Sequence, residues 1–218
     1  MGQPVGGVAR VQRPGAAARR HRRRVIGGSV AGALALLLIT VVLVLLVFSV
    51  QVSGSSMEPT LRSGDRLFVN LLHSGSKAHR FDIVQVRLGP QREQAVKRLI
   101  GLPGDQVRVR LDGRRNVVEL KPAGQQQWLR VENPAWEAAD DHRVCCDVLG
   151  RGSDDTTAAT VPVGMGWVLG DNLDYSDDSR TYGFVKLDDI GATLNLRVLP
   201  LGRAGHISHD DVVLRPVS

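Results

Sequence analysis

An uncharged segment from Val25 to Val50 constrains the fold of this chain more than any other feature. Residues 34–47 within it are almost entirely Leu, Val, Ile and Ala. About 24 residues at about 1.5 Å per residue would span a hydrocarbon core of about 30 Å. A cleavable signal peptide is the alternative, but its apolar region is usually only about 7–15 residues long. The sequence therefore predicts a transmembrane helix over residues 25–48.

Residues 1–24 form a basic arm in front of this segment. They contain seven arginines and no acidic residue, and they account for the formal net charge of +6, because the rest of the chain has 21 basic and 22 acidic residues. The arm is rich in Gly, Ala and Pro without apolar periodicity, which predicts disorder. Such an arm could bind nucleic acid, but beside an apolar segment it is more typical of a topology signal.

These two segments predict the location of the protein. Positively charged flanks of membrane helices stay in the cytoplasm. We therefore expect a single-pass protein of the cell membrane, with a cytoplasmic N-terminus, an extracytoplasmic domain after Phe48 and no nucleic-acid partner.

Residues 49–200 are predicted to form a mainly β domain. Short runs rich in Val, Leu and Ile alternate with Gly, Pro and Asp, a pattern typical of strands and turns. Residues 112–160 are less regular and predict a variable insertion, with exposed loops around Asp140 and Asp141 and an inserted hairpin or two. Residues 201–218 are predicted to be a C-terminal tail. The predicted strands are 65–70, 82–87, 95–100, 106–111, 161–169, 183–185 and 192–198.

The two cysteines, Cys145 and Cys146, are adjacent. This spacing suits neither a disulfide framework nor a CxxC metal or redox pair. We expect them to be small buried residues, rather than a vicinal disulfide.

The six histidines occur in polar contexts, and HExxH is absent. The sequence thus predicts no metal site and no cofactor.

A nucleophile and a base can be proposed from two segments. Ser56 follows the membrane segment closely, and Lys97 lies in an apolar run. A serine needs an unprotonated base to become nucleophilic, and burial lowers the pKa of a lysine from about 10.4. Taken alone, Lys97 could equally be a strand-end lysine with its amine in water, and Ser56 an ordinary turn residue.

Four segments in order resemble the motifs of bacterial type I signal peptidases, in particular those of Gram-positive and actinobacterial members. The segments are GSSMEPTL (54–61), RFDIV (80–84), VKRLIGLPGD (96–105) and GDNLDYSDDSR (170–180). The resemblance extends over roughly residues 48–110 and 161–190, and it indicates little about residues 112–160.

The resemblance implies a Ser/Lys endopeptidase that removes signal peptides from exported preproteins after small residues. It implies that Ser56 is the nucleophile that forms an acyl-enzyme and that Lys97 is its general base. Ser176 matches the serine that hydrogen-bonds and orients this lysine. The supporting ion pairs would be Asp178 with Arg180 and Arg98 with Asp171.

The resemblance also implies an oxyanion site and a substrate pocket. Some members carry a serine where this chain has Gly54, so the oxyanion would rely on backbone N–H groups, those of Ser56 and Gly54. The implied partners are preproteins, the lipid bilayer and, as an open candidate, the secretion translocon. By position, the apolar pocket residues would be Val50, Val52, Met57, Leu61, Ala95 and Val96.

The position of Ser56 agrees with this function. It follows Phe48 by eight residues, which span at most about 28 Å. The nucleophile would therefore lie near the bilayer surface, where a signal peptide emerges. The main alternative is a catalytically silent, membrane-tethered binding module of the same fold, although the presence of both Ser56 and Lys97 argues against it.

Overall fold

The computed structural model describes residues 16–113, 115–137, 139–154, 157–207 and 211–217, with side chains described from residue 30 onward. The chain divides into two compact units, Met1–Val47 and Phe48–Ser218. The first contains one long helix and the second contains the strands.

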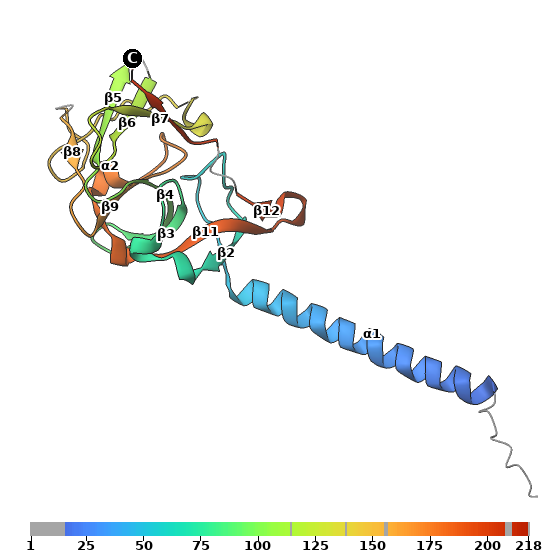
Figure 1. Ribbon diagram of the computed structural model, residues 1–218. Coiled ribbons are helices and arrows are strands. Elements are labelled where there is room, and N and C mark those ends of the chain that lie inside the picture. Colours follow the sequence, from blue (N-terminus) through green and yellow to red (C-terminus); the bar gives the residue numbers. More distant parts are fainter. Residues whose placement is uncertain (1–15, 114, 138, 155–156, 208–210, 218) are drawn as a thin grey trace, which may run out of the picture. The chain divides into compact units, whose positions relative to one another are not determined.

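The helix α1 spans Ala16–Val47 (Figure 1). Its segment Val30–Val47 has a mean hydropathy of 3.1 and is long enough to cross a membrane. The helix starts earlier than predicted, so the prediction of disorder was wrong for residues 16–24. Ala and Arg are strong helix formers, and Gly and Pro are absent from residues 16–24, so the helix continues beyond the apolar segment. The remainder of the predicted arm, residues 1–15, lies outside the described residues.

The first sheet of the second unit has eight described strands, and it carries the candidate site. All of its pairings are antiparallel. Seven strands follow one path, and β12 (Gly205–His206) pairs with β11. The path runs β1 (Ser49–Gln51), β2 (Arg66–Asn70), β11 (Ile190–Leu199), β3 (Ile83–Leu88), β4 (Glu93–Gly101), β9 (Met165–Leu169) and β10 (Val185–Lys186).

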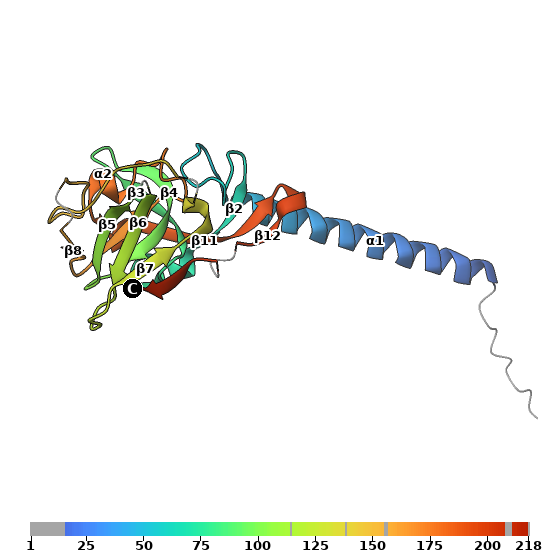
Figure 2. The same ribbon diagram turned by 90° about the horizontal axis from the view of Figure 1, so that it is seen from above.

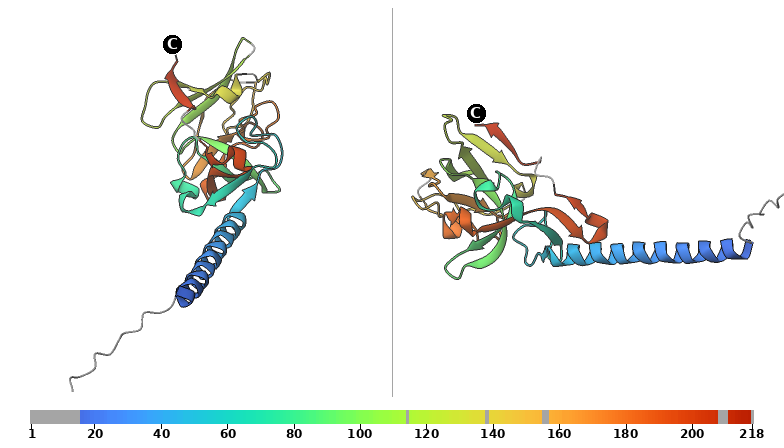
Figure 3. Two further views of the ribbon diagram at one scale, coloured as in Figure 1. Left: turned by 90° about the vertical axis from the view of Figure 1, so that its right-hand side faces the viewer. Right: turned by 60° about the horizontal axis from the view of Figure 1, so that its bottom comes forward.

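The second sheet is built largely from the predicted insertion. Figure 2 shows β5, β6 and β7 side by side, and Figure 3 shows the C-terminal strand next to β7. The order is β13 (Val213–Pro216), β7 (Leu129–Glu132), β6 (Arg115–Lys121), β5 (Gln106–Asp112) and β8 (Ala159–Thr160). Residues 201–218 are therefore not a simple tail, because they supply β12 and β13.

The two sheets share a hydrophobic core. Val107 and Leu120 from the second sheet pack in one cluster with Ile100, Trp167 and Leu169 from the first. All five side chains are fully buried. This core fixes the second sheet against the strands that carry the candidate site.

Helical turns are short in this unit. The one α-helix among its described residues is α2 (Ser179–Tyr182). The remaining turns are 3-10 helices at Leu71–His73, Gly75–Lys77, Pro134–Trp136, Leu187–Asp189 and Leu201–Arg203. The prediction of a mainly β domain with one N-terminal apolar helix is confirmed.

Local differences from the predicted strands have simple causes. The strand expected from residue 161 begins at Met165, because Met165 N–H closes a turn on the carbonyl of Pro162. The strand expected at 183–185 begins at Val185, because Gly183 has a φ of 81°, outside the extended region.

The cysteines also differ from the expectation. Cys145 and Cys146 are both buried, as predicted, but they are bonded to each other as a vicinal disulfide. The prediction that they are not bridged was therefore wrong, since adjacency in sequence did not prevent the two sulfurs from meeting.

Candidate active site

Ser56 lies on a turn that follows β1. Met57 is buried in the core beside Val52 and Leu67 and anchors this turn. Asn172 also holds this turn through two hydrogen bonds. The backbone N–H of Asn172 donates to the carbonyl of Ser56 at 3.0 Å, and its Nδ2 donates to the carbonyl of Ser55 at 3.1 Å. The turn is thus held to the loop that follows β9.

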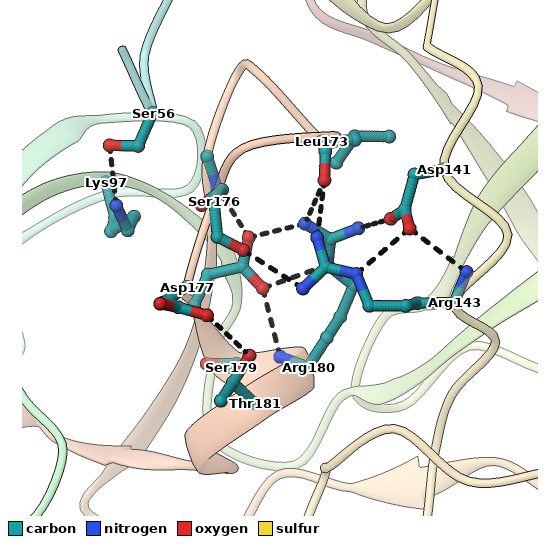
Figure 4. A network of polar contacts seen from close by, with 12 residues as sticks. Ser56, Lys97, Asp141, Arg143, Leu173, Ser176, Asp177, Ser179, Arg180 and Thr181 are labelled. Atoms are coloured by element: carbon teal, nitrogen blue, oxygen red, sulfur yellow. Dashed lines mark hydrogen bonds and ion pairs between the residues drawn. The ribbon is translucent and has the colours of Figure 1, made fainter. Parts of the chain in front are cut away.

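Lys97 lies on the central strand β4 and is only 3% exposed. Its Nζ is 2.7 Å from Oγ of Ser56, which is hydrogen-bond distance (Figure 4). Ser56 and Lys97 come from separate elements, and the structure brings them together as the sequence predicts. A hydroxyl and a buried amine at this separation can exchange a proton.

The surroundings of Lys97 favour its neutral form. Burial lowers the pKa of Lys97 from its usual value of 10.5, and Arg180 lowers it further, whereas Asp178, Asp177 and Asp171 oppose this shift. The burial effect is the largest of these, so the net direction is downward. An amine with a lowered pKa can act as a base at lower pH than a free lysine.

Arg98 follows Lys97 and points to the opposite face of β4. It is buried, and its Nε and Nη2 donate to Asp171 at 2.8 and 2.6 Å. Asn133 of the second sheet donates to the same carboxylate at 3.0 Å. Such a two-point ion pair fixes the start of the loop after β9.

Asp178 and Arg180 form the second predicted pair. Nε and Nη2 of Arg180 donate to Asp178 at 2.9 and 2.8 Å, and both side chains are buried. Burial raises the pKa of Asp178, but the hydrogen-bonded guanidinium of Arg180 outweighs it and holds this pKa below its ordinary value. Asp178 also accepts a hydrogen bond from the backbone N–H of Gly170 at 3.1 Å, so this residue joins the two ends of the loop after β9.

Asp141 is part of this network, although the sequence placed it in an exposed loop. It is 9% exposed and pairs with both Arg180 and Arg143. Figure 4 shows the Asp141 carboxylate in contact with the guanidinium groups of both Arg180 and Arg143. Asp141 is buried and not exposed because a buried carboxylate is tolerated where cations compensate its charge, and these cations become its neighbours only in the folded chain.

Ser176 is buried, but its predicted hydrogen bond to Lys97 is not formed. Its Oγ has no hydrogen-bond partner within 3.5 Å among the described residues, although the hydroxyl lies close enough to the Asp178 carboxylate to help lower the pKa of Asp178. A Cβ built on Gly170 would lie 2.3 Å from this Oγ and 2.4 Å from the carbonyl oxygen of Ser56. Ser176 is therefore packed against the Gly170 backbone, close to the nucleophile turn.

A pocket of about 240 Å³ adjoins Ser56. Five of the six predicted pocket residues line it, whereas Leu61 is buried in the core below the turn. The prediction for Leu61 was wrong, because its backbone N–H folds back onto the carbonyl of Met57 and turns its side chain inward. The pocket is lined by Val50, Gln51, Val52, Ser53, Ser56, Met57, Gln85, Gln94, Ala95 and Val96.

The N–H groups of the predicted oxyanion donors have no hydrogen-bond acceptor in the ranges that the structure describes. Neither Ser56 N–H nor Gly54 N–H donates a hydrogen bond within the described part of the chain. Gly54 has a φ of 87°, a backbone conformation that glycine adopts readily and other residues rarely do.

No group of His, Cys, Asp and Glu side chains among the described residues could hold a metal ion.

Comparison with known proteins places this chain in a family. The family model described as "Signal peptidase, peptidase S26" matches residues 26–199. The chain belongs to this family. Members of the signal peptidase I family are serine endopeptidases, so the chain is a hydrolase of that class.

The similar proteins include signal peptidases of Gram-positive bacteria. Signal peptidase I of Bacillus caldolyticus is 37% identical over 159 residues, which is 72% of this chain and 82% of that protein. Signal peptidase I V of Bacillus subtilis is 36% identical over 143 residues, 64% of this chain and 79% of that protein. A solved signal peptidase I from Enterococcus faecalis is 29% identical and covers 54% of this chain and 97% of that chain, with a TM-score of 0.38.

Several residues of this family member's site were not foreseen from sequence. Asn172 lies inside the motif at residues 170–180, so its contact with the site could have been predicted from that motif. The others, which lie in residues 112–160, carried no such signal. They are Asn133, Trp136, Asp141 and Arg143, and each hydrogen-bonds to the loop after β9 or to its ion pairs.

Proposed function

We propose that this chain is a membrane-anchored endopeptidase that cleaves signal peptides from preproteins by acylation of Ser56, with Lys97 as the general base. One observation carries the proposal: Nζ of the buried Lys97 is 2.7 Å from Oγ of Ser56. Burial also makes the neutral amine available, since it lowers the pKa of Lys97.

The reaction follows from these contacts. Ser56 Oγ attacks the scissile carbonyl while Lys97 Nζ takes the hydroxyl proton. Lys97 then gives this proton to the leaving amine of the mature protein, and the signal peptide stays on Ser56 as an ester. A water molecule, deprotonated by Lys97, hydrolyses the ester and regenerates the hydroxyl. The N–H groups of Ser56 and Gly54 stabilise the oxyanion in both steps.

Ser176 is proposed to orient Lys97 during this cycle. The ammonium formed when Lys97 accepts a proton has three donors, and the buried Oγ of Ser176 is an acceptor near the nucleophile turn. A hydrogen bond made only in the protonated state would stabilise the transition state and not the resting enzyme.

The pocket beside Ser56 is proposed to hold the residues before the scissile bond. Its volume of about 240 Å³ and its Val and Ala side chains suit small apolar residues. The Lys/Arg asymmetry around α1 supports a cytoplasmic N-terminus and an extracytoplasmic domain. The proposed partners are therefore preproteins and the lipid bilayer, with the secretion translocon as a further candidate.

Cleavage of a model preprotein by the detergent-solubilised enzyme tests this function. We expect Ser56→Ala and Lys97→Ala to abolish cleavage while circular dichroism shows intact folds. Survival of cleavage in Ser56→Ala would remove the nucleophile assignment. A wild-type enzyme that cleaves none of several preproteins would favour a silent binding module.

A further inference from the structure

Arg143 contacts the loop that carries Ser176, although it belongs to the segment outside the recognised motifs. Its Nη1 donates to the carbonyl of Ser176 at 3.2 Å, and its Nη2 donates to the carbonyl of Leu173 at 2.5 Å. Arg180 donates to the same Leu173 carbonyl at 3.1 Å. Two arginines thus hold the backbone of this loop (Figure 4).

Asp141 orients the Arg143 side chain. Its Oδ1 accepts the backbone N–H of Arg143 at 3.1 Å and the Nε at 2.9 Å, while its Oδ2 pairs with Nη1 of Arg180. Asp140 adds a backbone contact, because its N–H donates to Asp174 at 2.9 Å. The segment 140–143 is therefore joined to the loop at several points.

The position of the Ser176 side chain depends on its backbone. Its Oγ has no hydrogen-bond partner within 3.5 Å among the described residues, and its polar neighbour there is the buried carboxylate of Asp178. The packing on Gly170 and the bond from Arg143 to the Ser176 carbonyl hold the side chain in this place. A shift of the carbonyl would move the hydroxyl with it.

We propose that Arg143 is a positioning residue for the reaction: it holds the backbone of Ser176 in place, and Asp141 orients Arg143. This inference rests on the proposed function, in which Ser176 orients Lys97. Arg143 touches neither the substrate nor the reacting atoms, and it acts through the Ser176 backbone. The second sheet thereby contributes to catalysis, because the segment that supplies Arg143 follows β7 and pairs with β5 at Cys145.

A purely structural role would make Arg143 stabilise the fold without acting through Ser176. A double-mutant cycle separates the two roles. The variants are Arg143→Gln, Ser176→Ala and the combination, each made in the full-length enzyme and assayed on a model preprotein for kcat and KM. Arg151→Gln is the matched control, since Arg151 lies in the same segment and its 48% exposed side chain pairs with Asp147 outside this network.

We expect Arg143→Gln to lower kcat by about tenfold to a hundredfold with little change in KM, because a misplacement of about 1 Å can cost about a hundredfold in rate. Arg143→Lys should not restore kcat, since a single ammonium cannot replace the guanidinium fork. The double variant should have the kcat of Ser176→Ala alone. Arg151→Gln should have the wild-type kcat.

Other results would overturn the inference. Additive losses in the double variant would show that Arg143 acts independently of Ser176, and a wild-type kcat in Arg143→Gln would show that it does not act at all. A wild-type kcat in Ser176→Ala would instead remove the proposed role of Ser176, and this outcome is seen without any Arg143 variant. If Arg143→Gln does not fold, Asp141→Asn tests the same non-additivity while leaving the Arg143 side chain in place.

Discussion

Lys97 is the base in the proposed mechanism, and its charge depends on individual neighbours. Burial and Arg180 favour the neutral amine, whereas Asp178 and Asp177 favour the ammonium. Only the neutral amine accepts a proton, so kcat/KM should rise with pH through the lowered pKa of Lys97 and stay high above it. The acidic limb of the pH profile therefore reports this pKa.

Asp177 allows that dependence to be tested without breaking a buried pair, because its side chain is exposed. Asp177→Asn removes an anion that raises the pKa of Lys97, so we expect the acidic limb of kcat/KM to move to lower pH. Asp188→Asn, on an exposed turn that does not act on Lys97, is the control and should leave the limb in place. A limb that stays fixed or moves to higher pH in Asp177→Asn would contradict the assignment of Lys97 as the base.

Gly170 is a second residue whose identity matters. A Cβ there would lie within 2.4 Å of both Ser176 Oγ and the Ser56 carbonyl oxygen, and relief would require the nucleophile turn to move. Gly170→Ala should therefore lower kcat by about a hundredfold while the fold persists. In the control Gly191→Ala, the nearest atom to the new Cβ is 3.9 Å away, and kcat should be unchanged. Equal kcat values for the two variants would show that the close approach at Gly170 is not important.

At the scale of elements, β4 carries both the proposed base and residues of the proposed substrate pocket. Ala95 and Val96 line the pocket, and Lys97 and Arg98 follow on the same strand. Because side chains alternate along a strand, these residues reach the pocket, the nucleophile and the loop after β9 from one rigid segment. In the proposed function, one strand would therefore contribute to both substrate selection and proton transfer.

A larger residue at position 95 should alter substrate choice. Ala95→Leu adds three heavy side-chain atoms to a pocket of about 240 Å³, so we expect lower kcat/KM for preproteins with Ala or Ser before the scissile bond. Cleavage of a panel that varies the first and third residues before this bond measures the change. The dyad is untouched, so activity on glycine-containing variants should fall less. An unchanged preference across the panel would count against the assignment of this pocket.

At the scale of the whole molecule, the chain joins an apolar helix to an independent β unit. The boundary between the two compact units is at Val47, and β1 starts at Ser49. Eight residues separate Phe48 from Ser56, and they can span at most about 28 Å, so the proposed function expects the nucleophile within that reach of the bilayer surface. The proposed function needs this proximity, because its substrate is held in the same bilayer.

Topology can be measured on intact, wall-stripped cells. If the β unit is extracytoplasmic, added protease should digest residues 60–218 and leave a protected N-terminal fragment. Permeabilised cells serve as the control, in which the N-terminal arm also becomes accessible. Protection of residues 60–218 in intact cells would reverse the proposed orientation.

Much of the molecule was determined locally and could be predicted from sequence. The apolar segment depends on its length and composition, and the central strands β2, β3, β4 and β5 depend on short apolar runs. Ser56 and Lys97 were found through ordered motifs, and the 2.7 Å contact between them agrees with that prediction. These features depend only on residues close in sequence or on a recognisable pattern, so they can be predicted without knowledge of the fold.

Only the tertiary structure decided the rest of the site. Asp141 and Arg143 follow no motif, and they meet Arg180 and Ser176 only because the second sheet packs on the first. From sequence, the apolar Leu61 could line a pocket or belong to the core. The turn that follows Ser56 directs its side chain into the core. Burial of a charge depends on partners from distant parts of the chain, and sheet packing determines which partners meet.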